Sequence, residues 1–354
     1  MRVKKGTKNK EKLKNFLEKN YFFKIKSLNF IPKGADADSY IITAKSEDKF
    51  FVKVYDLEKI KRLNLRVHFE SLKVLNKLHK EQNISKISYP ILTKKNELYF
   101  NMGTNYRIVV SNFIEGKNDE RQLNKIQLEN FAKLMAEIHK SPKSLKKLIV
   151  HKETFDLSYL NDLVIILRKI VKKDYVKTPS QKKISKIILE NHTIILDFIK
   201  KTITLSKQLN LSKKDEVITH SDPYFLNLMK ARNEIYVIDW DGIKLGPKEQ
   251  DIWFYLIKGI CNKPFIFLYK YRESFGKFKL NKNMVHYYIQ SRILEDFYHY
   301  LKEILSGKKD KIYFEEIKDY SLGWILKIEE MFRDVDKIID KWNKLEEAHT
   351  SVSP

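Results

Sequence analysis

Three aspartates, Asp222, Asp239 and Asp241, crowd a single short stretch of this chain together with Asn227, between Val217 and Gly242. The stretch reads VITHSDPYFLNLMKARNEIYVIDWDG and contains two short apolar runs, VIT and IYVI. Like charges that share a poorly solvated site repel one another. Either these carboxylates lie on a solvated surface, or a positive group sits between them. Any fold of this chain has to meet one of these two conditions.

The composition is that of a protein with a large buried core. The chain has 354 residues, of which 43% are hydrophobic and 12% aromatic. This length suits two lobes or two domains, and the hydrophobic content disfavours wholesale disorder. The single cysteine, Cys261, excludes an intrachain disulfide. No apolar run reaches the roughly 18 residues that a membrane span needs. We therefore expect a cytoplasmic protein with no membrane partner.

The formal net charge of +24 raises the question of a nucleic-acid partner. Lysines are spread along the whole chain, however, and neither an arginine-rich motif nor a zinc-ligand spacing accompanies them. Between residues 213 and 260, eight acidic residues stand against seven basic ones, so this segment escapes the basic excess. We interpret the charge as a lysine-rich surface and expect no nucleic-acid partner. A non-enzymatic nucleic-acid-binding protein is the alternative.

The order of the periodic segments predicts an α+β protein with two lobes. Strand-like runs separated by turns fill the first part of the chain, and one segment with helical spacing interrupts them. After the polar stretch EGKNDER the pattern is mostly helical, apart from a small β insert. We predict a five-stranded antiparallel sheet with one main helix. The predicted divisions are an N-terminal nucleotide-binding lobe (1–112), a hinge (113–120) and a mostly helical catalytic and substrate-binding lobe (121–354).

The spacing of Asp222, Asn227 and Asp239 suits phosphoryl transfer from ATP. That reaction needs a base for the attacking hydroxyl, oxygen ligands for magnesium and a lysine on the phosphates. Asp222 and Asn227 are five residues apart in HSDPYFLN, and Asp239 ends the strand-like run IYVID. A divalent cation between Asn227 and Asp239 would relieve the repulsion among the acids. The alternative is that these are ordinary turn residues, since Asp and Asn are common in loops.

The motifs HSDPYFLN and YVIDWDGIKLGPKEQD resemble the signature of the aminoglycoside phosphotransferase and choline kinase superfamily. Within it, GADADSY, VITHSD and YYIQSRILEDFYHYLKEIL are most similar to spectinomycin phosphotransferase, and the resemblance covers nearly the whole chain. It implies a protein-kinase-like two-lobe fold and a small-molecule kinase that uses ATP and Mg²⁺. Carried over by position, it implies that Asp222 is the catalytic aspartate and that Asn227 and Asp239 hold the magnesium. We expect a monomer or a homodimer.

The resemblance also implies residues that hold the ATP phosphates. Lys53, inside the apolar strand FFVKVYD, is expected on the phosphates, and Glu70 in the next helix is expected to pair with it. A free ammonium is costly in such a strand, which argues against a surface lysine. Glu58 is the rival partner, and Glu70 alternatively lies on a solvated helix face. Gly34 and Ser39 belong to the loop KGADADSY, which lies where a turn over the phosphates is expected.

That loop has an alternative interpretation. Backbone N–H groups of a glycine turn can cradle phosphate, but Asp36 and Asp38 would oppose an anion. The loop alternatively closes over magnesium, or it is a plain hairpin turn. The adenine is expected against the segment VVSNFIEG, through Ser111, Asn112 and Phe113. Phe113 is alternatively an ordinary core residue.

Three carboxylates are expected to recognise the acceptor substrate. Asp241 either supports the metal ligands or contacts a cationic substrate. Glu295 and Asp296 lie beside aromatics in SRILEDFYHY and suit a wall for an amine-bearing ring, or else form a solvated acidic pair. We favour an aminoglycoside or aminocyclitol acceptor, spectinomycin-like. A kinase of the same fold for choline, homoserine or a sugar, or a spore-coat-type relative, is the alternative.

Overall fold

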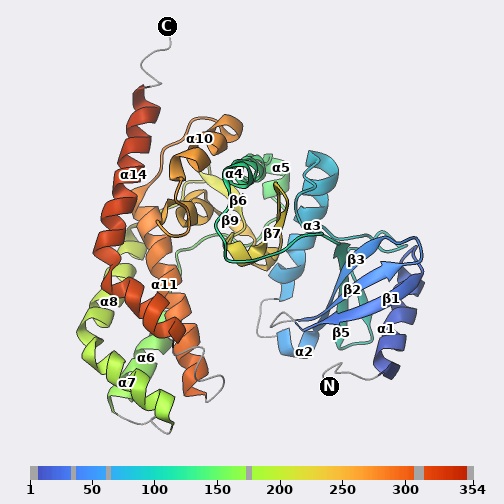
Figure 1. Cartoon of the computed structure of the whole chain (residues 1–354), viewed down its shortest axis with the longest axis horizontal. Coiled ribbons are helices and arrows are strands. Elements are labelled where there is room, and N and C mark those ends of the chain that lie inside the picture. Colours follow the sequence, from blue (N-terminus) through green and yellow to red (C-terminus); the bar gives the residue numbers. More distant parts are fainter. Residues whose placement is uncertain (1–6, 33–36, 61–64, 173–177, 307–314, 349–354) are drawn as a thin grey trace. The chain divides into compact units, whose positions relative to one another are not determined.

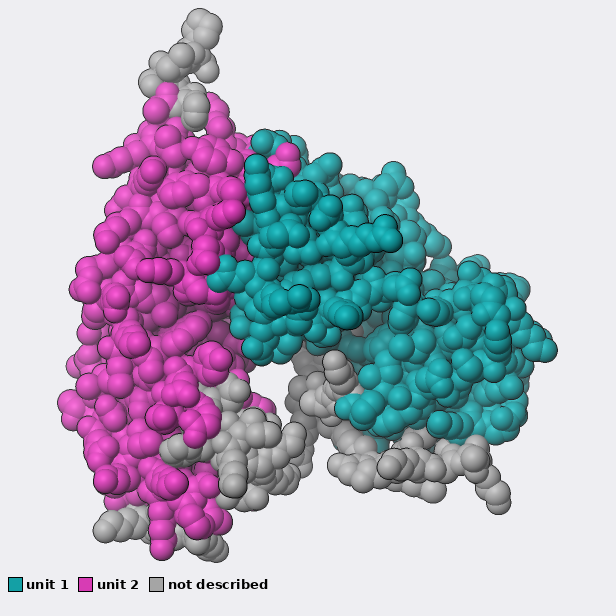
Figure 2. Space-filling model, in the orientation of Figure 1, with its two compact units in different colours: residues 1–152, 217–245, 273–275 teal, residues 153–216, 246–272, 276–354 magenta. Residues whose placement is uncertain are grey.

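Two units make up the protein, and each is assembled from segments that are distant in the sequence (Figure 2). The computed structural model describes residues 7–32, 37–60, 65–172, 178–306 and 315–348. The first unit combines residues 1–152, 217–245 and 273–275, and the second combines 153–216, 246–272 and 276–354. The motif stretch that opened the sequence analysis therefore belongs to the same unit as the N-terminal strands. The lobe boundaries drawn from the sequence stay a prediction.

A five-stranded antiparallel sheet forms the N-terminal part of the first unit, with strand order β1-β2-β3-β5-β4 (Figure 1). The strands are β1 (Ile25–Ile31), β2 (Ala37–Ala44), β3 (Lys49–Asp56), β4 (Phe100–Met102) and β5 (Tyr106–Asn112). Each strand pairs antiparallel with its neighbour. This confirms the predicted five-stranded antiparallel sheet.

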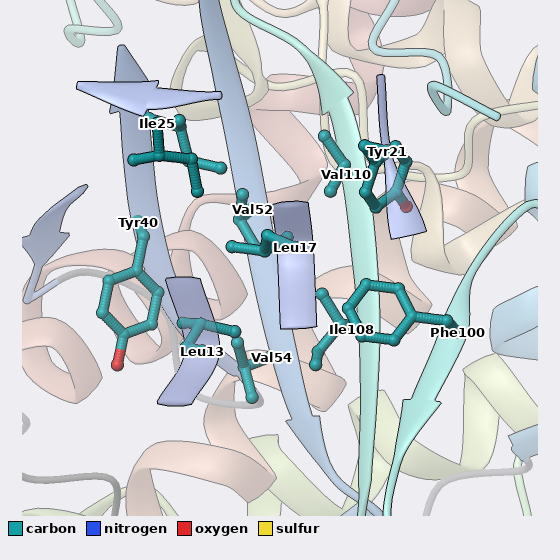
Figure 3. Packing of buried hydrophobic residues seen from close by; sticks show 11 residues of the cluster. Leu13, Leu17, Tyr21, Ile25, Tyr40, Val52, Val54, Phe100, Ile108 and Val110 are labelled. Carbon is teal, nitrogen blue, oxygen red and sulfur yellow. The ribbon is translucent and has the colours of Figure 1, made fainter. Parts of the chain in front are cut away.

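One face of the sheet packs against an N-terminal helix, α1 (Thr7–Asn20). Leu13 and Leu17 of α1 are buried beside Val52 and Val54 of β3, in the cluster drawn in Figure 3. The two leucines are four residues apart, so they share one side of the helix. Their segment is lysine-rich, and the sequence analysis did not predict a helix there. The sheet thus carries α1 in addition to the one main helix that was expected.

The other face of the sheet packs against that expected helix, α3 (Leu65–Gln82). Tyr55 of β3 is buried there against Phe69 of α3, with the two rings 5.5 Å apart and nearly perpendicular. Successive side chains of a strand point to opposite faces of the sheet. Because Val52 and Val54 face α1, Lys53 and Tyr55 face the α3 side. This alternation places the Lys53 ammonium on the same side of the sheet as the motif residues described below.

The remaining elements of the first unit carry the motif residues. The helices α4 (Lys125–His139) and α5 (Lys143–Lys146) follow the sheet, and α4 begins with a capping box between Asn124 and Gln127. Two small two-stranded sheets, β6 with β9 and β7 with β8, frame the motif stretch. The bounds are β6 (Glu216–Thr219), η1 (Phe225–Asn227), β7 (Leu228–Ala231), β8 (Glu234–Val237), η2 (Trp240–Gly242) and β9 (Lys244–Pro247).

The second unit is helical and is organised around the long helix α11 (Lys282–Leu305). This helix contacts α6, α7, α8, α9 and α14, and Figure 1 shows α11 alongside α14. The other bounds are α6 (Tyr159–Val171), α7 (Pro179–Glu190), α8 (His192–Gln208), α9 (Glu249–Ile252), η3 (Trp253–Leu256), α10 (Pro264–Phe275), η4 (Glu316–Leu322), α13 (Gly323–Leu326) and α14 (Ile328–Ala348). The mostly helical C-terminal part is thereby confirmed. Within the described ranges, every helix is too short or too polar to cross a membrane.

A buried carboxylate ties the end of α14 into the second unit, and this gives a stability prediction. Glu346, whose side chain is 3% exposed, lies 2.7 Å from the Arg272 guanidinium and accepts a hydrogen bond from the Phe278 N–H. We expect Glu346→Ala to lower the free energy of unfolding by about 3–5 kcal/mol, because it leaves a buried charge without its counter-ion. Chemical denaturation measures this loss.

The neighbouring glutamate is the matched control. Glu347 pairs with Lys279 at the same 2.7 Å distance, but both side chains are about 60% exposed. Glu347→Ala should cost less than about 1 kcal/mol, since water screens an exposed pair. Equal losses in the two variants would show that burial does not govern the Glu346 interaction.

Candidate active site

The Lys53 ammonium lies between two carboxylates of the motif stretch. Its Nζ is 3.1 Å from Asp239 Oδ1, to which it donates a hydrogen bond, and 3.4 Å from Asp241 Oδ2. The Lys53 side chain is 29% exposed, so water screens these contacts only in part. Two of the three crowded aspartates, Asp239 and Asp241, therefore share a positive group that lies between them.

The shifts in pKa follow from this arrangement. Burial alone would lower the pKa of Lys53, but its electrostatic interactions with Tyr55, Asp241 and Asp239 hold it well above its usual value. Burial also raises the pKa of Tyr55, so Tyr55 is neutral at pH 7 and the two aspartates supply the negative charge. Lys53 is therefore a permanent cation at physiological pH.

The two aspartates respond differently to their shared site. Burial would raise the pKa of Asp239, but the charge and hydrogen bond of Lys53, with a contribution from His220, lower it. Burial raises the pKa of Asp241 to about 6, and repulsion from Asp239 adds to the rise while Lys53 opposes it. Asp239 is thus the firmly ionised member of the pair, as a metal ligand has to be.

The loop after β6 carries Asp222 and is joined to segment 238–242 at two points. The His220 ring nitrogen Nε2 lies 2.8 Å from the Ile238 carbonyl oxygen, and the His220 ring packs edge-on against Trp240. The Ser221 hydroxyl donates to the Gly242 carbonyl oxygen at 2.8 Å. Two segments some twenty residues apart in the chain are thereby held side by side.

Two of the seven described non-glycine residues with a positive φ lie at this junction. Ser221 has φ of 77° and Asp239 has φ of 64°, both in the left-handed region that side-chain-bearing residues rarely adopt. Such conformations persist only where surrounding contacts impose them, and they cluster at functional sites. The hydrogen bonds of Ser221 and the ion pair of Asp239 are contacts of that kind.

Asn227 directly supports Asp222. Its side-chain Nδ2 donates to the Asp222 main-chain oxygen at 2.8 Å and to Asp222 Oδ2 at 3.1 Å. The Asn227 carbonyl oxygen accepts from the Ile238 N–H at 2.9 Å, so Asn227 is held next to the segment that ends in Asp239. The structure thus brings Asp222, Asn227, Asp239 and Lys53 together within one unit.

Asn227 and Asp239 offer only two side-chain oxygen ligands, but this is enough for magnesium. Among the residues that the structure describes, no three His, Cys, Asp or Glu side chains gather as a metal centre. Mg²⁺ commonly binds proteins through one or two carboxylates, with substrate phosphates and waters completing its shell. The ionised Asp239 carboxylate and the oxygen of the Asn227 amide are hard donors of the required type. The residues present therefore fit the cation that the sequence implied.

The expected nucleotide contacts fall at different places in the first unit. Gly34 lies outside the described residues. Ser39 is buried on β2, directly opposite Lys53 on β3. Glu70 is half-buried on α3, and the carboxylates that contact Lys53 are those of Asp239 and Asp241. The pairing of Glu70 with Lys53 stays a prediction.

The three residues expected against adenine lie at the end of β5. The Asn112 side chain accepts from the Tyr89 N–H at 2.8 Å and donates to the Ile87 carbonyl at 3.2 Å. Its amide group therefore braces the segment before β4. Ser111 donates to the Phe51 carbonyl at 3.5 Å, and the Lys49 ammonium lies 5.5 Å from the ring centroid of Phe113.

The expected substrate carboxylates on α11 belong to the second unit. Asp296 pairs with Arg292 one turn earlier, at 3.0 Å. Glu295 is exposed, and its charge adds to burial in raising the pKa of Tyr159 and of Tyr287. Both acids thus lie in the surroundings of tyrosines, and Asp296 already has a cationic partner; a substrate role for them stays a prediction.

Tyr55 and Lys230 lie near the candidate site, but neither was singled out from the sequence. Tyr55, two residues after Lys53, places its ring 6.0 Å from the Lys53 ammonium. Lys230 lies in β7, and its side chain is 9% exposed. The signal that singled out Lys53, a lysine inside an otherwise apolar strand, is also present at Lys230 in the run LMKA.

Comparisons with known proteins identify the family and the fold. The sequence profile of the phosphotransferase enzyme family (APH) matches residues 27–274. The fold and the match together define a small-molecule phosphotransferase with a kinase-like architecture. The chain belongs to the phosphotransferase enzyme family, which confirms the family suggested by its motifs. Among curated protein sequences, none matches the chain.

Solved structures show the same fold. Spectinomycin phosphotransferase APH(9)-Ia, in complex with ADP and spectinomycin, is 23% identical with a TM-score of 0.73, and the match covers 92% of this chain and 98% of that one. Its AMP-bound complex gives 24% identity and a TM-score of 0.68, over 88% and 95% of the two chains. An aminoglycoside phosphotransferase from Alicyclobacillus acidocaldarius is 11% identical with a TM-score of 0.60, over 94% and 96%.

The left-handed backbone at Ser221 gives a prediction that can be tested without any substrate. Ser221→Gly loses the hydroxyl but relieves the strain, whereas Ser221→Ala loses the hydroxyl and keeps the strain. Because the left-handed conformation costs an L-residue roughly 1–2 kcal/mol, the glycine variant should be the more stable of the two by about that amount. Thermal or chemical unfolding of the pair provides the measurement.

A serine in a helix supplies the control with the opposite sign. Ser291 lies in the middle of α11, where alanine is favoured over glycine by about 1 kcal/mol. Ser291→Ala should therefore be more stable than Ser291→Gly. If Ser221 showed the same order as Ser291, the backbone at Ser221 would not be strained as described.

Proposed function

We propose that this protein is an ATP- and Mg²⁺-dependent kinase that phosphorylates a hydroxyl group of a small cationic molecule. An aminoglycoside or aminocyclitol is the favoured acceptor class, with spectinomycin as the first candidate. The observation that carries the proposal is the arrangement of Lys53, Asp239 and Asp241 beside the Asp222–Asn227 loop. The neighbouring structures of spectinomycin phosphotransferase with ADP or AMP support a nucleotide as the second substrate.

Each residue has a distinct role in the proposed reaction. Asp222 orients the acceptor hydroxyl and takes its proton as the oxygen attacks the terminal phosphorus of ATP, so that ADP leaves. Lys53 supplies positive charge for the phosphates, and its partners hold it on the α3 side of the sheet. Asn227 and Asp239 are the residues that would hold magnesium. The bound cation would neutralise charge that develops on the phosphoryl oxygens.

Other nucleotide contacts complete the proposal. Gly34 and Ser39 are proposed to contribute to phosphate binding, and Glu70 to assist Lys53. The adenine is proposed to lie against Ser111 to Phe113 at the end of β5. Since the Asn112 amide braces residues 87 and 89, we assign the adenine contact to main-chain groups of this segment.

The acceptor is proposed to be cationic because the assigned residues are carboxylates within a strongly basic chain. Asp241 pairs with the Lys53 ammonium, and Glu295 and Asp296 of α11 lie near enough to Tyr159 of α6 to help raise its pKa. Carboxylates and aromatic faces in a partly desolvated site contribute binding free energy to a charged amine, whereas they repel an anion. A neutral sugar would gain less binding free energy from the same groups.

An ATP-consumption assay across acceptors, paired with an Asp222 variant, tests the proposed reaction. The wild-type protein should consume ATP in the presence of spectinomycin or another aminocyclitol, more than with neutral sugars or organic acids. Asp222→Asn keeps the shape but loses the proton acceptor, so turnover should fall about 10²- to 10⁴-fold. Its affinity for ATP, measured by calorimetry, should change little.

The outcomes separate the two parts of this proposal. Turnover of neutral or anionic acceptors alone would contradict the cationic acceptor and leave the kinase in place. Asp222→Asn activity within about threefold of wild type would remove Asp222 from the reaction. Absence of turnover with every acceptor class, in a protein that does not bind ATP, would contradict the kinase itself.

The Glu295 carboxylate gives a separate prediction about the acceptor. Glu295→Gln removes one charge next to Tyr159 and Tyr287. A pairing with a charged group is worth roughly 1.5–3 kcal/mol, so the KM for the amine acceptor should rise at least about tenfold. The KM for ATP should stay nearly unchanged. Glu303→Gln, two turns further along α11, is the control, and an equal effect there would contradict a specific role for Glu295.

A further inference from the structure

Lys230 is a nearly buried lysine outside the set of residues assigned above. Its ammonium donates to Asp119 Oδ1 at 2.8 Å and to the main-chain oxygens of Asp119 and Arg121 at 2.9 and 2.5 Å. All three acceptors belong to the segment 116–121, which follows β5. A buried ammonium is costly unless paired and hydrogen-bonded, and here three oxygens meet this demand. Lys230 therefore holds this segment rather than pointing to solvent.

The main chain joins the same two segments. The Lys117 N–H donates to the Lys230 oxygen at 3.0 Å, and the Lys230 N–H donates to the Lys117 oxygen at 2.8 Å. Gly116 permits this approach, because a Cβ there would lie 2.8 Å from the Lys230 carbonyl oxygen. The Asn118 amide donates to the Leu226 carbonyl at 2.9 Å. Segment 116–121 is therefore attached both to β7 and to the turn that precedes it.

A second set of contacts leads from Lys230 to the proposed catalytic loop. The Lys230 ammonium lies 5.3 Å from the ring centroid of Phe225, within the range of a cation–π interaction. Phe225 is the first residue of η1, and this turn ends at Asn227. Asn227 in turn donates to the Asp222 carboxylate at 3.1 Å. A continuous series of contacts thus runs from Asp119 through Lys230 and Phe225 to Asp222.

We propose that Lys230 is a positioning residue for phosphoryl transfer. With Asp119 it holds segment 116–121 against β7, and through Phe225 it keeps Asn227 and Asp222 in their places. This inference rests on the proposed function. Lys230 makes its contacts with protein groups, so its effect falls on the geometry of the reacting groups and hence on kcat. Misplacement of a reacting group by about 1 Å can cost on the order of 10²-fold in rate.

Kinetics and hydrogen exchange on the full-length protein test this proposal. Lys230→Met should lower kcat by about 10- to 100-fold. The KM for ATP should stay within about threefold of wild type. Lys230→Arg retains a donor and a charge, so it should recover part of the loss. Amide exchange of a peptide covering residues 222–231 should be faster in Lys230→Met than in wild type, because the Asn227 N–H and its neighbours lose their support.

Two further variants complete the experiment: Lys133→Met as a control at an exposed lysine, and Asp119→Asn as a less disruptive change to the same ion pair. Lys133 on α4 is 57% exposed, and Lys133→Met removes the same charge from a solvated place, so kcat and exchange should stay unchanged. Should Lys230→Met fail to fold, the nearly isosteric Asp119→Asn carries the test, with the same direction of change in kcat and exchange. In a double-mutant cycle the two substitutions should be less than additive, since they break one interaction.

The outcomes are distinguishable from failure of the proposed function. A wild-type protein that neither binds ATP nor consumes it with any acceptor class would contradict the kinase proposal, while exchange at residues 222–231 would still decide whether Lys230 supports the loop. The Lys230 proposal is overturned if kcat and loop exchange stay at wild-type values. It is equally overturned if exchange rises uniformly over both units, because Lys230 would then stabilise the fold without positioning the loop.

Discussion

The ion pair of Lys53 with Asp239 and Asp241 is the interaction on which the site depends. Two carboxylates that are two residues apart in one tight turn repel each other unless a cation lies between them. The ammonium at 3.1 and 3.4 Å provides that cation and joins strand β3 to a segment 186 residues away. Asp239 has a left-handed backbone, and the hydrogen bonds of His220 and Ser221 hold the neighbouring loop against the segment that carries this ion pair.

The first unit contains two ion pairs of the same kind. Lys53 in β3 and Lys230 in β7 are lysines inside apolar strands, and each meets an aspartate from a distant segment. Because an ammonium cannot be buried without compensation, each lysine requires its carboxylate partner to be nearby. One pair joins the sheet to residues 239–241, and the other joins segment 116–121 to the β7–β8 hairpin. The proposed reacting groups therefore rest on two charge pairs rather than on apolar packing alone.

Most of the architecture could be predicted from the sequence, because strands and helices leave periodic patterns. The five-stranded sheet, the helix after β3 and the helical second half all followed from such patterns. Helix α1 was not predicted, because Leu13 and Leu17 have helical spacing but lie among lysines. These two leucines are buried because α1 covers an apolar face of the sheet. At the site, the motif residues were found by their spacing. The partners of Lys53 and the role of Asn112 as a brace depend on contacts between distant segments, which no local pattern encodes.

The sequence by itself determined the chemical types and their local geometry. The spacing of Asp222, Asn227 and Asp239 indicated a phosphotransferase, and the alternation of FFVKVYD directed Lys53 away from Val52 and Val54. Only the tertiary structure decided which carboxylates share the Lys53 charge and that Lys230 joins Asp119 to the β7–β8 hairpin. The physical reason is that periodicity and spacing act over a few residues of chain, whereas electrostatic pairing acts over a few ångströms of space.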